Sequence, residues 1–223
     1  IRVVADEPRV CPHLHLCLQS GSDRILARMK RRYRVAGFLE RCRRIRAALD
    51  RPALTTDVIV GFPGETDDDF EATCRTVREA GFLKVHVFSY SSRQGTAAAE
   101  FAEAVPPPVV AERRERLHRL ERELADDYLH GLIGRRLDVL VEGSEDGRPG
   151  YVRGTACRYA PVVFRGHAPA LLRRRVPVRA TAAADGVLLG EPEPEAGGGP
   201  IPQPPTSPVR RPLPLLTGDA RNA

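Results

Sequence analysis

Two stretches of the sequence decide the fold class. His13 to Asp23 reads H-L-H-L-C-L-Q-S-G-S-D, and Thr55 to Thr66 reads T-T-D-V-I-V-G-F-P-G-E-T. In both, an apolar strand pattern ends in a polar turn that contains glycine, and a helical pattern follows the turn. Parallel α/β sheets present functional groups in this way, because their ligands bind at the carboxyl ends of the strands. The two stretches therefore predict a parallel α/β sheet with a ligand site at that end.

Three strands and two helices follow from the apolar pattern around these stretches. Strands are predicted over 14–18, 54–60 and 84–90, the second rich in β-branched residues. Helical spacing fills both gaps, and Thr66 and Gly81 stand where the second helix needs an N-cap and a C-terminal stop. This alternation implies parallel strands joined by right-handed crossovers. Three strands complete neither a closed barrel nor a doubly wound sheet, so we expect a further N-terminal half.

A charged helix and an all-β unit come next. We interpret residues 106–133 as a connecting helix packed on the sheet rather than as an RNA-binding helix, because charge on a helix usually marks a solvated face. Five short strands with alternating apolar residues lie at 137–142, 151–156, 160–165, 174–180 and 186–191. They predict a small closed barrel of the OB type over 134–190, an architecture that often holds oligonucleotides. Residues 191–223 are rich in proline and glycine, and we expect a disordered tail there.

Composition favours a polyanionic partner. The 223 residues carry a net charge of +6, and nearly all of the basic side chains are arginine, which suits phosphate and RNA contacts. A solvated basic surface is the alternative. No segment resembles a signal peptide, and no apolar run reaches the roughly 20 residues of a membrane helix, so we expect a cytoplasmic protein without a membrane partner.

The cysteines and histidines do not form a metal pattern. The five cysteines are odd in number and widely spaced, and they match neither a disulfide framework nor a zinc site. We predict buried structural thiols at Cys17, Cys42 and Cys74. The strand histidines His13, His15 and His86 lack a helical i, i+4 partner, and we interpret them as structural. We assign no metal ligand.

Four motifs together resemble one family. They are the His13–Asp23 stretch, L-A-R-M-K-R-R-Y at 26–33, D-V-I-V-G-F-P-G-E-T-D-D-D-F at 57–70 and H-V-F-S-Y-S-S-R-Q-G-T at 86–96. In this order they resemble the radical S-adenosylmethionine (SAM) methylthiotransferases that modify tRNA, and the following barrel resembles the TRAM domain of that family. Single motifs also occur in oxygen-independent coproporphyrinogen oxidases and elongator-type tRNA acetyltransferases. The TRAM-like barrel argues against both.

The resemblance implies a fold and its cofactors. Residues 1–105 would be the C-terminal half of a radical SAM partial (β/α) barrel. In the family one 4Fe-4S cluster reduces SAM to a radical and a second cluster supplies sulfur. The cysteines for both clusters are expected upstream of Ile1, in the missing N-terminal half, so we expect this portion alone to be inactive. The implied partner is tRNA, and no DNA partner is expected.

The substrate within the family is less strongly marked. The R-R-Y at 31–33 and K-V-H-V-F-S-Y-S-S-R at 84–93 favour the branch that acts on threonylcarbamoyladenosine beside the tRNA anticodon. The isopentenyladenosine branch is the alternative, and the ribosomal-protein branch usually reads differently at Q-S-G-S-D. A stand-alone RNA-binding module without catalysis is a third hypothesis, from a different functional class.

Candidate cofactor-binding residues follow from the resemblance and are not catalytic by themselves. Gln19 and Ser20 end the first strand and are expected to bind the ribose or the amino-acid group of SAM. Ile59 and Gly61 are expected to pack against adenine, with a core strand and turn as the alternative. The backbone from Phe88 to Tyr90 is expected to meet the adenine edge.

Several other polar residues have both a structural and a functional interpretation. Ser22 and Asp23 more simply cap the next helix, and Glu65 either acts as a base or orders its turn. Asp57 interrupts an apolar strand and is either functional or paired internally. Arg93 binds phosphate or substrate or is a plain surface residue. On the barrel, we expect RNA contacts from Arg135, Arg153 and Arg158.

Overall fold

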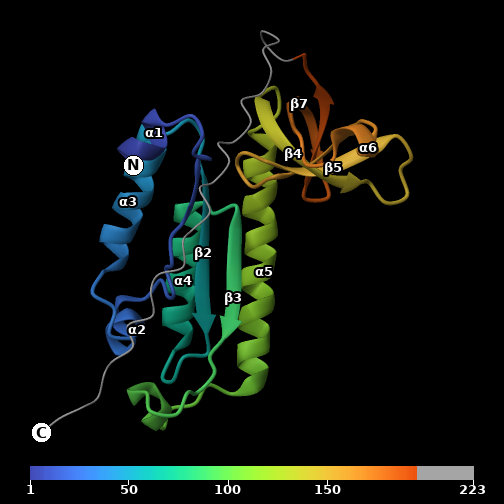
Figure 1. The fold of residues 1–223 in the computed structure, drawn as a ribbon. Coiled ribbons are helices and arrows are strands. Elements are labelled where there is room, and N and C mark those ends of the chain that lie inside the picture. The colour runs from blue at the N-terminus through green and yellow to red at the C-terminus, as the bar shows by residue number, and fades with distance from the viewer. Residues whose placement is uncertain (195–223) are drawn as a thin grey trace, which may run out of the picture.

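The computed structural model describes residues 1–194 as an α/β layer and a closed β-barrel, joined by one long helix (Figure 1). The connecting helix, α5 (Pro107–His130), runs along the sheet and ends beneath the barrel. Most of the tail predicted at 191–223 lies outside the described residues. Its first two positions belong to the last barrel strand, β8 (Val187–Pro192).

The sheet has three parallel strands in the order of the sequence, as predicted. They are β1 (His13–His15), β2 (Ala53–Val60) and β3 (Lys84–Ser89). β1 is shorter than predicted, because the chain leaves the ladder after His15 and returns to it through one bridge between Gln19 and Val58. The register pairs His15 with Thr55 and Asp57 with His86.

Helices with well-formed ends separate the strands. They are α2 (Asp23–Arg28), α3 (Val35–Ala48) and α4 (Asp67–Ala80), preceded by α1 (Arg2–Asp6) and followed by the short η1 (Ala97–Glu100), and neither α1 nor η1 was predicted. Ser22 caps α2, and Thr66 forms a capping box with Asp69 at the start of α4. Gly81 ends α4 in the left-handed conformation (φ 59°). The predicted caps are confirmed.

One face of the sheet is covered and the other is largely open. Leu54, Val58 and Val60 of β2 point into a core shared with α3, α4 and α5. The alternate residues of the same strand face away from these helices, because successive side chains of a strand point to opposite sides. Asp57 and Ile59 on that side are half-exposed. We call this side the open face.

The prediction of buried thiols holds for two of three cysteines. Cys42 and Cys74 lie in the helix-covered core. Cys17 is exposed, so the prediction is wrong there. Its neighbours Leu16 and Leu18 turn toward the core, and the alternation places the Cys17 side chain toward the open face, where Sγ lies 3.5 Å from an Asp57 carboxylate oxygen.

The connecting helix packs on the sheet domain, as interpreted from its sequence. Leu117 and Leu120 are buried in the sheet core. Arg113 is also buried, and it forms ion pairs with Glu65 and Asp67 at 2.7 Å each. Arg113, like the buried Glu121 of the same helix, therefore belongs to the interior rather than to a solvated face.

The closed barrel is confirmed, with five strands in the order β4-β5-β6-β8-β7. Its remaining elements are β4 (Arg136–Ser144), β5 (Tyr151–Ala156), β6 (Pro161–Arg165), the short α6 (Ala168–Leu171) and β7 (Arg175–Ala184). Phe164 and Val139 are completely buried in its core. Gly154 lets β5 approach β4 closely, because a Cβ there would lie 2.1 Å from the carbonyl oxygen of Leu140.

The barrel rests on the amino-terminal end of the sheet. The Arg158 guanidinium donates to the backbone carbonyls of Asp50 and Arg51 at 3.0 and 3.2 Å. Tyr128 donates to the same Arg51 carbonyl, and burial at this junction raises the pKa of Tyr128 to about 12 against the opposing charges of Arg158 and Arg51. His13 stacks on Tyr159 with ring centroids 4.1 Å apart.

Within residues 1–194, no helix combines the length and the apolar character that crossing a membrane requires.

Candidate functional site

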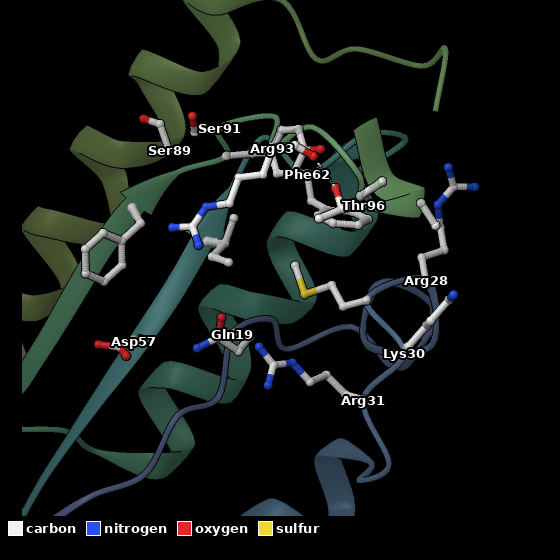
Figure 2. A pocket seen from close by; sticks show the side chains of 16 residues that line it. Gln19, Arg28, Lys30, Arg31, Asp57, Phe62, Ser89, Ser91, Arg93 and Thr96 are labelled. Atoms are coloured by element: carbon white, nitrogen blue, oxygen red, sulfur yellow. Dashed lines mark hydrogen bonds between the residues drawn. The ribbon is translucent and has the colours of Figure 1, made fainter. Parts of the chain in front are cut away.

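A cleft of about 710 Å³ opens at the carboxyl ends of the three strands, where the sequence predicts the ligand site. Figure 2 looks into this strand-end cleft. Its lining comes from all three strand ends and from the segments that follow α2 and β3. The lining residues are Gln19, Arg28, Met29, Lys30, Arg31, Asp57, Ile59, Phe62, Phe88, Ser89, Tyr90, Ser91, Arg93, Thr96, Ala97 and Ala98.

Gln19 is fixed by backbone bonds on both sides. Its amide donates to the Asp57 carbonyl at 2.8 Å, and its own carbonyl accepts from the Ile59 amide at 2.9 Å. Its φ is 65°, a left-handed conformation that is uncommon for a residue with a side chain. These contacts hold Gln19 at the wall of the strand-end cleft.

One side of the cleft is apolar and contains an unsatisfied hydroxyl. Ile59, Phe62 and Phe88 line it, and Phe62 meets the Tyr90 ring edge-on with centroids 5.3 Å apart. The Tyr90 hydroxyl is buried without a hydrogen-bond partner among residues 1–194. A buried hydroxyl without a partner is rare.

The rest of the cleft is strongly basic. Arg28, Lys30, Arg31 and Arg93 line it, and Asp57 is its one acidic residue within the described part of the chain. Arg28 is paired with Glu103 at 2.8 Å. The surplus of positive charge suits a ligand with a carboxylate or phosphate group.

Two predicted cofactor residues do not line the cleft. The Ser20 side chain is completely buried, with its hydroxyl 3.4 Å from that of Thr73. Gly61 has φ 74°, and a Cβ there would lie 2.5 Å from a methyl group of Val110 on α5. Both residues shape the turns behind the cleft, and their contact with a cofactor stays a prediction.

Glu65 orders the G-F-P-G-E-T turn, the second of its two readings. Its carboxylate accepts from the Gly61 amide at 2.8 Å and from Arg113 at 2.7 Å. Burial raises the pKa of Glu65, while these two donors oppose the shift. The other Glu65 oxygen has no partner within residues 1–194. A buried pair with these contacts fixes the turn against α5.

Asp69 links the ends of two helices. It accepts from the Ser22 hydroxyl at 2.6 Å and from the Arg24 guanidinium. Burial raises the pKa of Asp69, but hydrogen bonds from Arg24, Ser22 and Thr66 outweigh it and hold the pKa well below its usual value. Ser22 is therefore a structural residue.

Sequence reasoning missed the basic residues at the end of α2 and just after it. Arg28, Lys30 and Arg31 all line the strand-end cleft, although residues 26–33 had indicated only a family resemblance. The run of basic residues between two helices was the available signal. Of the predicted site residues, the structure brings Gln19, Ile59, Phe88, Tyr90 and Arg93 together.

The barrel arginines have different environments. Arg135 pairs with Asp50 at 2.6 Å, and the Arg158 side chain is 11% exposed at the junction. Arg153 is exposed beside Asp146. Their contact with RNA stays a prediction, and for Arg135 and Arg158 the structure adds a role in docking the barrel.

A second basic feature of the barrel was not foreseen. Arg148 lies over the Tyr151 ring, 3.9 Å from its centroid, and Arg165 lies 5.8 Å from the same centroid. Arg148 and Arg165 are exposed, and all three residues line one hollow at the ends of β5 and β6. We call this group the Arg–Tyr–Arg stack.

Comparison with known proteins finds a superfamily that part of the chain matches. Residues 1–77 match the sequence model of the Radical SAM superfamily.

Similar proteins carry one name. The tRNA-2-methylthio-N(6)-dimethylallyladenosine synthase of Chloroflexus aurantiacus is 42% identical over 198 residues, which cover 86% of this chain and 41% of that protein. The synthase of Mycobacterium ulcerans is 43% identical over 195 residues, or 86% and 37% of the two chains. That of Nocardia farcinica is 49% identical over 145 residues, or 65% and 29%. The chain thus spans about two fifths or less of the length of these relatives.

These matches support the resemblance to radical SAM tRNA methylthiotransferases. They do not support the threonylcarbamoyladenosine branch, because the relatives are named for dimethylallyladenosine. Dimethylallyl is an isopentenyl group, so the alternative substrate fits better than the first expectation.

Proposed function

We propose that this chain is the SAM-binding and tRNA-binding portion of a radical SAM methylthiotransferase acting on dimethylallyladenosine in tRNA. The observation that carries the proposal is the strand-end cleft, which gathers four of the residues expected to bind the cofactor: Gln19, Ile59, Phe88 and Tyr90. The similarity to dimethylallyladenosine synthases supports the substrate. The tRNA substrate implies action in the cytoplasm.

The cleft fits SAM in size and chemistry. Its volume of about 710 Å³ lies within the usual range of small-molecule sites, roughly 300–1,000 Å³. Ile59 and Phe88 offer an apolar surface to adenine, and the Gln19 side-chain amide offers a polar contact. Arg93 supplies positive charge for the carboxylate. When bound beside a reduced iron–sulfur cluster, SAM supplies an organic radical.

The iron–sulfur clusters need groups of ligands that residues 1–194 do not bring together. Fe–S clusters are held mainly by groups of cysteine thiolates. Among residues 1–194, which include all five cysteines, no three cysteines gather within ligand reach of one another. We therefore propose that a separate cluster-bearing part completes the enzyme. β1 is an edge strand, and its free edge is where further parallel strands would add to the sheet.

The barrel supplies the proposed tRNA contact. Its closed five-stranded form is one that binds single-stranded nucleic acids through basic and aromatic side chains. The Arg–Tyr–Arg stack provides both kinds of side chain on the surface. Guanidinium planes and aromatic rings both stack on bases.

A chimera tests the proposal. Residues 1–194 would replace the matching region of the Chloroflexus aurantiacus relative, and the product would be reconstituted anaerobically with iron and sulfide. Two tRNA substrates, one bearing dimethylallyladenosine and one bearing threonylcarbamoyladenosine, would be supplied with SAM and a reductant. We expect mass spectrometry of digested tRNA to show a methylthio group only on dimethylallyladenosine.

Matched controls make the result decisive. The unmodified relative reports the competence of the reaction, and a chimera with Arg93→Gln and Phe88→Ala tests the cleft itself. A chimera that holds its clusters and binds tRNA but yields no product overturns the proposed catalysis and leaves the RNA-binding module as the function. Product on threonylcarbamoyladenosine alone overturns the proposed substrate.

A further inference from the structure

Three side chains from three neighbouring strands converge on the open face. His15 comes from β1, Asp57 from β2 and His86 from β3. Their nearest nitrogen and oxygen atoms all lie within 4.8 Å of one another, and His15 Nε2 is 3.2 Å from Asp57 Oδ2. The parallel register explains the convergence, because Asp57 pairs directly with His86 and His15 pairs with Thr55, on the same side of β2 as Asp57.

The orientation of His15 is set by Thr55. The Thr55 hydroxyl lies 3.0 Å from His15 Nδ1 and 3.1 Å from His13 Nε2. Without an ion, the His15 Nε2–H donates to Asp57. With an ion bound, a proton on Nδ1 lets His15 donate to Thr55 and leaves the Nε2 lone pair for the ion. Histidines that bind metals are usually held in this way, with the second ring nitrogen bonded to an oxygen.

The group is accessible from a second cleft. This junction cleft, of about 1,120 Å³, lies between the open face and the barrel, and His15, Thr55 and His86 line it together with Tyr159. The His86 side chain is exposed and has no hydrogen-bond partner within residues 1–194, and its ring centroid lies 5.9 Å from that of His15, so the ring is free to turn toward the other two ligands. An ion can reach the group without any change in the strands.

The lysine on the same side of β3 does not compete for this position. Lys84 precedes His86 on the same side of β3, but its ammonium group is paired with Glu121 of α5 at 2.5 Å. Glu121 also lies 3.4 Å from His118 and is 7% exposed. Within residues 1–194, Asp57 forms no ion pair with a lysine or an arginine, and its one charged partner is His15.

We propose that His15, Asp57 and His86 bind one divalent transition-metal ion, with at least one coordination position left open toward the junction cleft. Two imidazoles and one carboxylate suit Zn²⁺ or another first-row metal ion, whereas Ca²⁺ and Mg²⁺ prefer sites made of oxygen atoms. Three protein ligands leave a fourth position for water or for a ligand in the cleft. This site goes beyond the proposed methylthiotransferase function and uses no residue assigned to SAM.

A direct titration tests the site. The whole chain, freed of metal with a chelator, would compete for Zn²⁺ with a chromophoric chelator. We expect one Zn²⁺ per chain, and we expect His15→Ala, Asp57→Asn and His86→Ala each to weaken binding at least tenfold. His167→Ala, at the start of α6 in the barrel, is the matched control and should leave the affinity unchanged. Circular dichroism would confirm that each variant is folded.

A second experiment tests whether the exposed thiols, rather than His15, Asp57 and His86, bind the ion. Cys17 is exposed near Asp57 and Cys11 is exposed nearby in the chain, so both must be tested as sources of binding. With Co²⁺ as the probe, we expect visible absorption bands without a thiolate-to-cobalt charge-transfer band, and unchanged affinity in Cys11→Ser and Cys17→Ser. Absence of Zn²⁺ binding, binding that survives His86→Ala, or binding lost only with the serine variants would each overturn the proposal.

Discussion

The barrel and the sheet differ in how completely they bury their apolar side chains. The barrel closes its hydrogen-bond ladder on itself, and its large aromatic residue, Phe164, is completely buried. The sheet ends at β1 and β3, is covered by helices on one side only, and leaves Phe88 52% exposed on the other. A closed core excludes ionisable groups because burying them unpaired is costly, whereas an open face can carry them. The proposed SAM and metal sites therefore lie on the sheet.

Alanine substitutions at Phe164 and Phe88 should show this difference most strongly, as a change in the free energy of unfolding. Phe164→Ala should leave a cavity in the barrel and cost about 3–5 kcal/mol of unfolding free energy, whereas Phe88→Ala should cost about 0.5 kcal/mol or less. Hydrogen exchange followed by mass spectrometry would localise the loss, and we expect faster exchange in peptides from 136–192 only. Equal acceleration in the sheet strands would show that the two parts unfold as one unit.

Arg113 is the place where the connecting helix stabilises the sheet. Arg113→Ala leaves Glu65 buried without its partner and should cost about 3–5 kcal/mol, measured by urea unfolding. Arg114→Ala, at an exposed neighbouring position of the same helix, is the control and should change stability by about 0.5 kcal/mol or less. If the ion pair is responsible, replacing both partners as Arg113→Met and Glu65→Leu should recover much of the loss. A double variant as unstable as the single one would contradict this account.

The local parts of the fold were predictable from the sequence. Strand and helix identities follow from apolar periodicity, and Thr66 and Gly81 mark the ends of α4 because their roles depend on a few neighbouring backbone groups. The five barrel strands were also found, since each alternates apolar and polar residues. β1 was predicted too long, because Gln19 returns to the ladder only by an isolated bridge.

The site was predictable only where its residues follow a strand end. Gln19, Ile59, Phe88, Tyr90 and Arg93 meet because parallel strands share one end. The grouping of other residues depends on long-range geometry that local patterns do not contain. His15, Asp57 and His86 meet only because of the strand register. Arg158 contacts Asp50 across the junction between barrel and sheet. The exposure of Cys17 depends on which face of the sheet the helices cover.

Asp69 links α4 to α2 through its negative charge, so its contribution to the free energy of unfolding depends on pH. The folded state lowers its pKa, which means that its stabilisation is complete above the usual carboxyl pKa of about 4 and is lost as the pH falls toward the lowered value. Asp69→Asn should cost about 1–2 kcal/mol at pH 7, a discounted figure because Arg24 is half-exposed. The difference from the unsubstituted chain should shrink in acid.

Urea unfolding at pH 7 and at pH 3 would check this. Asp68→Asn removes a neighbouring exposed charge from the same first turn and should cost less than Asp69→Asn at both pH values. A penalty for Asp69→Asn that stays constant with pH would mean that its charge is not the source of the effect.

The barrel should show the smallest effects, because its proposed contacts with tRNA lie on the surface. If Arg148 and Arg165 each neutralise one phosphate, the Arg148→Gln, Arg165→Gln double variant should lower the slope of log affinity against log salt by about 1–2, with little dependence on base sequence. Filter binding of tRNA to the whole chain at several salt concentrations measures this slope. Arg119→Gln with Arg122→Gln removes the same charge from the exposed side of α5 and is the matched control. An equal change in both double variants would show that tRNA responds only to net charge, and the closed barrel would then have no specific nucleic-acid surface.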